Sequence, residues 1–163
     1  MTMRAVSFEL NGEPVAALAR PLDTLQSVLR HQLGMTGTKA GCRQGGCGSC
    51  TVWLDGEPVL ACLTPVEHVE GHSITTIEGL GAAETLSPVQ AIFYERFAIQ
   101  CGFCSPGMIM AATALLERNP DPTRAEIIEA LAGNVCRCTG IVPIVDAIEA
   151  AAARTREEEA AKA

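Results

Sequence analysis

Eight cysteines carry the most evident chemistry in this sequence, and they fall into two groups of four. Thiolates bind zinc ions and iron–sulfur clusters, whereas in an oxidising compartment cysteines form disulfides instead. The grouping therefore predicts two separate sites, one from each group. The first group is Cys42, Cys47, Cys50 and Cys62, and the second is Cys101, Cys104, Cys136 and Cys138.

The spacing within the first group is C-x4-C-x2-C, and a fourth cysteine follows after eleven intervening residues. Plant-type [2Fe–2S] sites use this spacing. Glycines surround these cysteines and would let the backbone wrap closely around a cluster, with N–H groups directed at its sulfurs. The second group is spaced C-x2-C and C-x-C, in two segments that must converge on one site. Both groups are thus expected to hold iron–sulfur clusters.

Disulfides, zinc and unrelated buried thiols are the other interpretations of the same cysteines. The sequence begins Met-Thr-Met-Arg4 with no apolar export signal, and a Cys136–Cys138 disulfide would close a very short, strained ring, so disulfides are disfavoured. Unrelated buried thiols are disfavoured as well, because chance would seldom divide all eight cysteines into two groups of four. Two four-cysteine zinc sites in a structural or regulatory protein remain the alternative, although C-x4-C-x2-C is unusual for zinc.

Composition excludes several classes of function. The chain has 163 residues and a formal net charge of −7, which argues against a nucleic-acid partner. The stretch from Phe97 to Leu116 has no charged residue and is as long as a membrane span. Its interior, Gln100 to Gly107, contains cysteines, glycine and proline that would break such a helix. We expect two buried helical pieces joined by a cysteine loop, no membrane association, and a cytoplasmic protein.

The elements that must position the cysteines differ between the two halves. Alternating apolar residues, tight-turn signals and one capped helix predict a small α+β sheet in the first half. Its strands are expected at 6–10, 51–54, 58–63 and 73–77, with the Asn11-Gly12 turn after the first strand and a helix from Asp23-Thr24 to Gly34.

Helical periodicity replaces the strands after Gly81. Capping boxes at Ser87 and Thr123 predict two helix starts. The apolar residues after Ser87, which include Phe93 and Phe97, are expected on one buried face. Another helix is predicted at 108–116, and the helix that starts at Thr123 is expected to end at Gly133. The last helix is predicted from 143 to about 154, with a frayed acidic end at 157–159. The predicted domains are 1–78 and 79–163.

Three runs of sequence contain most of these cysteines: Gly37 to Cys50, Gln100 to Gly107 and Gly133 to Gly140. They resemble the small subunit of the molybdenum hydroxylases, the family of xanthine dehydrogenase, aldehyde oxidoreductase and carbon monoxide dehydrogenase. The resemblance covers residues from about 4 to 152. It implies an N-terminal β-grasp, plant-type ferredoxin-like domain followed by a four-helix domain, each with one [2Fe–2S] cluster.

The same resemblance implies an electron-transfer subunit with no catalytic residue of its own. The helical-domain cluster would lie near the molybdopterin cofactor of a large subunit, and the ferredoxin-like cluster would pass electrons towards FAD on a medium subunit. Gln100 and Cys138 match positions that hydrogen-bond the pterin. The implied assembly is a heterotrimer, either alone or as a dimer of heterotrimers. Ile141 departs from the family pattern, which has an aromatic residue there, and this difference affects packing rather than metal binding.

Overall fold

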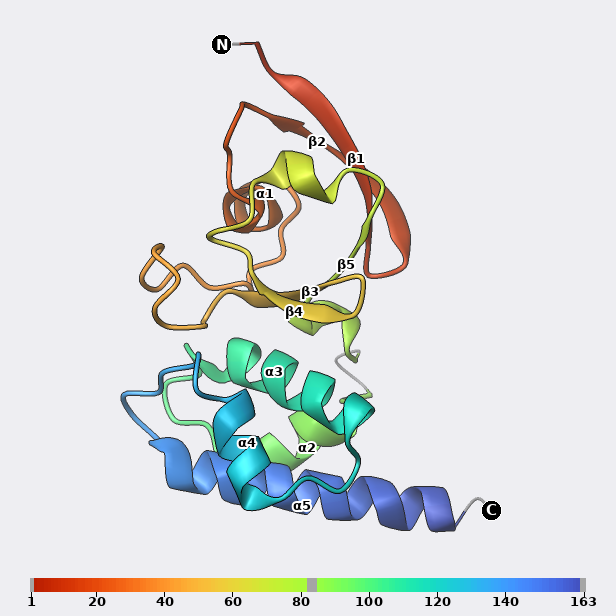
Figure 1. The fold of residues 1–163 in the computed structure, drawn as a ribbon, viewed down its shortest axis with the longest axis vertical. Helices are drawn as coiled ribbons and strands as arrows, with labels where there is room; N and C mark the ends of the chain where they lie inside the picture. Colours follow the sequence, from red (N-terminus) through yellow and green to blue (C-terminus); the bar gives the residue numbers. More distant parts are fainter. Residues whose placement is uncertain (1, 82–84, 162–163) are drawn as a thin grey trace.

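A five-stranded mixed sheet forms the first layer of the structure, a computed structural model that describes residues 2–81 and 85–161 (Figure 1). The strand order is β2-β1-β5-β3-β4, with β1 and β5 parallel and the other neighbours antiparallel. One helix, α1, packs against the sheet, so the predicted β-grasp arrangement is confirmed. The elements are β1 (Arg4–Leu10), β2 (Glu13–Ala19), α1 (Leu25–His31), β3 (Thr51–Leu54), β4 (Glu57–Leu60) and β5 (Ser73–Thr75).

Two hairpins in this sheet turn through similar residue pairs, one Asn-Gly and the other Asp-Gly. Asn11 and Gly12 have φ of 52° and 86°, and Asp55 and Gly56 have φ of 51° and 85°. Two successive positive φ angles give the turn whose twist matches a β-hairpin, and Asn, Asp and Gly tolerate this conformation best. The side chains of β1 alternate between exposed and buried positions, and the buried ones are apolar and lie in the core.

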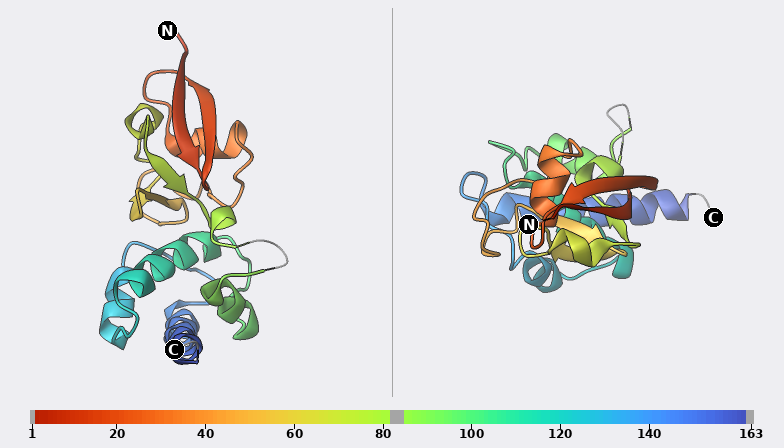
Figure 2. Two further views of the ribbon diagram at one scale, coloured as in Figure 1. Left: turned by 90° about the vertical axis from the view of Figure 1, so that its right-hand side faces the viewer. Right: turned by 90° about the horizontal axis from the view of Figure 1, so that it is seen from above.

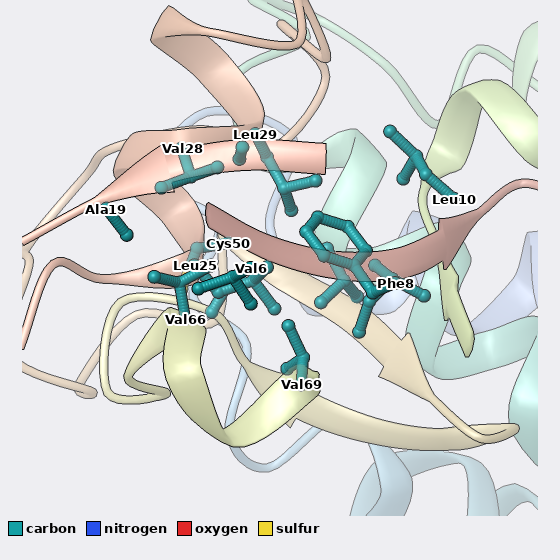
Figure 3. Packing of buried hydrophobic residues seen from close by; sticks show 14 of the residues in the cluster. Val6, Phe8, Leu10, Ala19, Leu25, Val28, Leu29, Cys50, Val66 and Val69 are labelled. Atoms are coloured by element: carbon teal, nitrogen blue, oxygen red, sulfur yellow. The ribbon is translucent and has the colours of Figure 1, made fainter. Parts of the chain in front are cut away.

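The core of the sheet layer lies between the strands, α1 and the short 3₁₀ helix η1 (Val66–Val69), as Figure 3 shows. Thr24 caps α1 by accepting a hydrogen bond from the Ser27 N–H at 3.2 Å. Strand β4 ends at Leu60, earlier than the predicted residue 63, because the chain turns there and the Leu63 N–H bonds back to the Leu60 carbonyl. That turn carries Cys62.

Four helices form the second layer, as predicted for the C-terminal half (Figure 1). Both predicted capping boxes are present, at Ser87 and at Thr123, with reciprocal hydrogen bonds in each. The helices are α2 (Pro88–Glu95), α3 (Ser105–Arg118), α4 (Arg124–Ala130) and α5 (Ile141–Ala160), and the 3₁₀ helix η2 (Ile77–Gly79) leads into this layer from β5. None of the described helices is long and apolar enough to cross a membrane.

Three predictions about these helices are wrong. Residues 97–104 are not helical, so the uncharged stretch contains one helix, α3, rather than two. Phe97 adopts φ of 54° and is 84% exposed, because the Ala98 N–H bonds back to Phe93 and ends α2 before Phe97 could join its buried face. Helix α5 begins before Pro143 and continues through the predicted frayed end. Proline fits in a first turn because its missing N–H would have no partner there.

The two layers contact each other mainly through α3, which lies beneath β3 and β4 (Figures 1 and 2). The Trp53 indole N–H donates to the Met110 carbonyl at 3.0 Å, and Trp53, Met110 and Ala114 form a small buried cluster between the layers. The two larger cores are made of residues from 6–74 and from 89–151. The division into folding domains at residues 78 and 79 agrees with these cores and stays a prediction.

Candidate metal centres

Seven of the eight cysteines lie in three segments of the chain, and Cys62 lies in the turn after β4. The loop 36–50 and the segments 97–104 and 132–140 lie on the same side of the molecule (Figure 1). Several cysteines lie at or near the start of an element: Cys50 directly precedes β3, Cys104 directly precedes α3, and Cys138 lies shortly before α5. All eight are free thiols. In this structure none of them forms a disulfide.

The first group is arranged as two pairs of thiols. The Cys42 thiol lies beside that of Cys47, and the Cys50 thiol lies beside that of Cys62, since each neighbour affects the pKa of the other thiol. Cys47 also acts electrostatically on Cys50, which places the pairs side by side. Cys42 and Cys47 are half-buried, whereas Cys50 and Cys62 are buried. One pair thus faces the surface and the other faces the core of the sheet layer.

Backbone N–H groups surround the outer pair. The amides of Gln44 and Gly46 lie 3.5 and 3.3 Å from the Cys42 sulfur. The Gln44 amide, followed by the Cys47 thiol, lowers the pKa of Cys42 to about 7. Burial raises the pKa of Cys50 to about 12. A metal must displace these protons, because it binds the thiolate, and the same N–H groups then stabilise the bound sulfur.

Two glycines allow the loop to lie this close to its surroundings. Gly45 has φ of 80°, and a Cβ placed there would lie 2.5 Å from the Leu63 side chain. A Cβ at Gly41 would lie 2.9 Å from the Cys47 sulfur. The space beside the thiols is therefore closed to any larger residue at these two positions. This is the close backbone approach that the glycine-rich sequence predicts.

The second group is also arranged as two pairs, formed across its two segments. Cys101 pairs with Cys138, and Cys104 pairs with Cys136. Cys101 and Cys138 are exposed, and the Phe103 backbone N–H lowers the pKa of Cys101. Burial raises the pKa of Cys104 to about 12. The C-x2-C and C-x-C segments therefore lie beside each other, and a shared site for their four cysteines stays a prediction.

The paired arrangement fits a [2Fe–2S] cluster in each group. Such a cluster has two irons, and four cysteines supply two thiolates to each of them. A zinc site instead needs its four ligands around a single point. Paired thiols and N–H groups directed at sulfur are the donor set of an iron–sulfur site. Gly41 and Gly45 let the loop lie close beside it.

The two groups are joined by a direct hydrogen bond between the layers. The Val135 N–H donates to the Cys47 carbonyl at 3.0 Å. Beside it, the Asn134 side-chain amide donates to the Gly48 carbonyl, also at 3.0 Å. A Cβ at Gly107 would lie 2.2 Å from that same carbonyl oxygen, so the backbones of the loop and of α3 nearly touch.

Two protein families match the chain. Residues 4–93 match the family described as "2Fe-2S iron-sulfur cluster binding domain", and residues 76–149 match "[2Fe-2S] binding domain". The nicotine 6-hydroxylase small subunit of Paenarthrobacter nicotinovorans is 46% identical over 88% of this chain and 86% of its own length. The nicotinate dehydrogenase small FeS subunit of Eubacterium barkeri is 42% identical over 94% of this chain and 98% of its own length.

The chain belongs to the molybdenum hydroxylase family, as an iron–sulfur small subunit.

Solved structures agree with this assignment. A chain of quinoline 2-oxidoreductase from Pseudomonas putida 86 superimposes on this iron–sulfur subunit with a TM-score of 0.91 and 44% identity, over 96% of this chain and 98% of that chain. The aldehyde oxidoreductase of Desulfovibrio desulfuricans gives a TM-score of 0.92 at 45% identity, but this subunit spans only 18% of it. The α+β fold predicted from the sequence is therefore that of the family.

Gln100 lies at the exposed side of the second group. It is exposed, directly precedes Cys101, and takes no part in ending α2, whose C-cap is Arg96. Phe103 and Val135 belong to the two cysteine segments, and their exposed fractions are 47% and 55%. Sequence reasoning did not find the pairing of the thiols or the Val135–Cys47 hydrogen bond. Neither has a local signal, since both join residues from different elements.

Proposed function

We propose that this subunit relays single electrons through two [2Fe–2S] clusters, between a molybdopterin site and an FAD site on partner subunits. The observation that carries the proposal is the pair of four-thiol sites joined by the Val135–Cys47 hydrogen bond. Each cluster, when bound, takes up and releases one electron at a time. The chain itself positions the two clusters and sets their surroundings.

The thiol pairs suggest how each cluster is held. Cys42 with Cys47, and Cys50 with Cys62, are the proposed ligands of the first cluster. Cys101 with Cys138, and Cys104 with Cys136, are the proposed ligands of the second. Hydrogen bonds from Gln44 and Gly46 would stabilise charge on the Cys42 sulfur. The buried sulfurs of Cys50 and Cys62 would be kept from water by the core of the sheet layer.

The second cluster is the one proposed to face the molybdopterin subunit. Cys101 and Cys138 are the exposed thiols of the chain, and Gln100 beside them is exposed as well. An amide side chain offers both donors and an acceptor to the polar edge of a pterin. We therefore propose Gln100 and Cys138 as pterin contacts. Exposed Phe103 and Val135 would then pack against the large subunit.

The first cluster is proposed to pass electrons to FAD on a medium subunit, in a heterotrimer or its dimer working in the cytoplasm. Support comes from relatives that are named as small subunits and that this chain matches over most of their length. The relatives include enzymes named for nicotine, nicotinate and quinoline, and others named for aldehydes. The substrate would bind in the large subunit, outside this chain.

Purification of the tagged chain from its native host tests this proposal. We expect it to copurify with a large molybdopterin-containing chain and an FAD-containing chain. In that complex, Gln100→Ala should leave both clusters assembled and should weaken molybdopterin retention or slow cluster reduction through the molybdenum site. Loss of the second cluster in Gln100→Ala would contradict the assigned role of Gln100. A chain that purifies alone with stoichiometric zinc would contradict the function.

A further inference from the structure

Gln26 on α1 is a buried polar residue without a hydrogen-bond partner for its amide nitrogen. The residue is 4% exposed, and within the part of the chain that the structure describes its Nε2 atom has neither solvent contact nor an acceptor. An unsatisfied buried N–H group costs about 1–3 kcal/mol unless an acceptor is supplied. Its neighbours on α1, Leu25, Val28 and Leu29, are apolar core residues.

The position of Gln26 relates it to both thiol pairs of the first group. Its backbone N–H donates to the Ala61 carbonyl at 3.0 Å, and Ala61 directly precedes Cys62. Gln26 also lines a hollow of about 320 Å³ together with Arg43, which directly follows Cys42. The residue therefore lies between the two segments that carry ligands from opposite pairs. The Nε2 atom itself has no contact with solvent, although the residue borders that hollow.

We infer that the Gln26 side-chain amide donates a hydrogen bond to a sulfide of the first cluster, and so raises its reduction potential. The inference rests on the proposed function, since the acceptor exists only when the cluster is bound. A donor stabilises the reduced form, which carries more negative charge on its sulfurs. Gln26 is thus a positioning and tuning residue.

Redox titration of the full chain with both clusters, monitored by electron paramagnetic resonance, tests this inference. Gln26→Leu keeps a similar size and removes the donor. We expect about a tenfold lower equilibrium constant for reduction of the first cluster, which equals about 59 mV for a one-electron couple, and no change in the second. Gln26→Met supplies the same measurement if the branched side chain prevents folding. Gln26→Glu, which replaces the donor with an oxygen, should lower the potential further.

The control variant is Thr113→Val. Thr113 on α3 also has a buried, unpartnered polar atom, but it lines a different hollow with Ser87, Leu116 and Thr155, away from the cysteine segments. It should leave both potentials unchanged. Cys47→Ser, which removes a ligand of the first cluster, identifies the signal of that cluster.

An unchanged first-cluster potential in Gln26→Leu and Gln26→Met would overturn the inference, as would an equal shift of both clusters. Wild-type chain without iron–sulfur clusters would instead contradict the proposed function itself.

Discussion

The backbone N–H of Val135 donates to the carbonyl oxygen of Cys47 at 3.0 Å. Val135 directly precedes Cys136, so this single bond connects a residue of the first cysteine group to the neighbour of a residue in the second. The contact is tight, because Gly48 and Gly107 meet beside it with no room for a side chain. This junction is therefore one of the contacts that set the separation of the two proposed clusters.

Gly107→Ala should push the two cysteine groups apart. The added Cβ would lie 2.2 Å from the Gly48 carbonyl oxygen, so α3 or the loop must shift. We expect both clusters to assemble, a weaker magnetic interaction between them when both are reduced, and a loss of about 1–3 kcal/mol in stability. Gly133→Ala is the control, since a Cβ there meets nothing within 4 Å. Equal spectra for wild type and Gly107→Ala would show that the junction does not set the spacing.

Gly45→Ala should selectively reduce occupancy of the first cluster. Gly45 has φ of 80° and its Cβ would clash with Leu63, so the loop carrying Cys42 and Cys47 would be distorted. Gly46→Ala is the matched control, because open space surrounds its Cβ and its N–H can still bond to the Cys42 sulfur. Iron content per chain measures the effect. Similar losses in the two variants would contradict the role of loop geometry.

The starts and turns of many elements follow closely from local sequence patterns. Asn11-Gly12 and Asp55-Gly56 specify their hairpins through positive φ angles, and Thr24 specifies the start of α1. Capping boxes at Ser87 and Thr123 do the same for α2 and α4. Each of these signals acts within a few residues, which is why the sequence reveals it.

Features that depend on distant residues were predicted less well or not at all. The exposure of Phe97 follows from how α2 ends, and a pattern of apolar residues does not encode that ending. The cysteine spacing predicts which thiols belong to one group, whereas their pairing depends on turns from several elements. Trp53 and Met110, far apart in the sequence, meet only because α3 packs beneath the sheet.

Trp53→Phe should destabilise the contact between the layers. The change removes the indole N–H that donates to the Met110 carbonyl and leaves a gap in a buried cluster. We expect a decrease of about 1–3 kcal/mol in the free energy of unfolding, measured by denaturant titration of the cluster-loaded chain. Tyr94→Phe is the control, because Tyr94 is 74% exposed and should change stability by less than about 0.5 kcal/mol. Equal values for the two variants would contradict the importance of this contact.

Glu95 should contribute stability that depends on pH. A hydrogen bond from Arg154 on α5, at 3.0 Å, lowers the pKa of the Glu95 carboxyl below its ordinary value of 4.5. A lowered folded-state pKa gives stability that is present above pH 4.5 and is lost as the pH falls through the folded-state value. Glu95→Gln should therefore unfold more readily than wild type near neutral pH, and the difference should vanish in acid. A difference that persists or grows in acid would contradict this ion pair's role.

Iron, acid-labile sulfide and spin quantification on the purified chain test the central claim most directly. Two [2Fe–2S] clusters predict about four irons and four sulfides per chain. On full reduction they also predict two separate electron paramagnetic resonance signals, each accounting for about one spin. Cys47→Ser should abolish one signal and preserve the other. Stoichiometric zinc without acid-labile sulfide, in protein prepared both with and without air, would contradict the account.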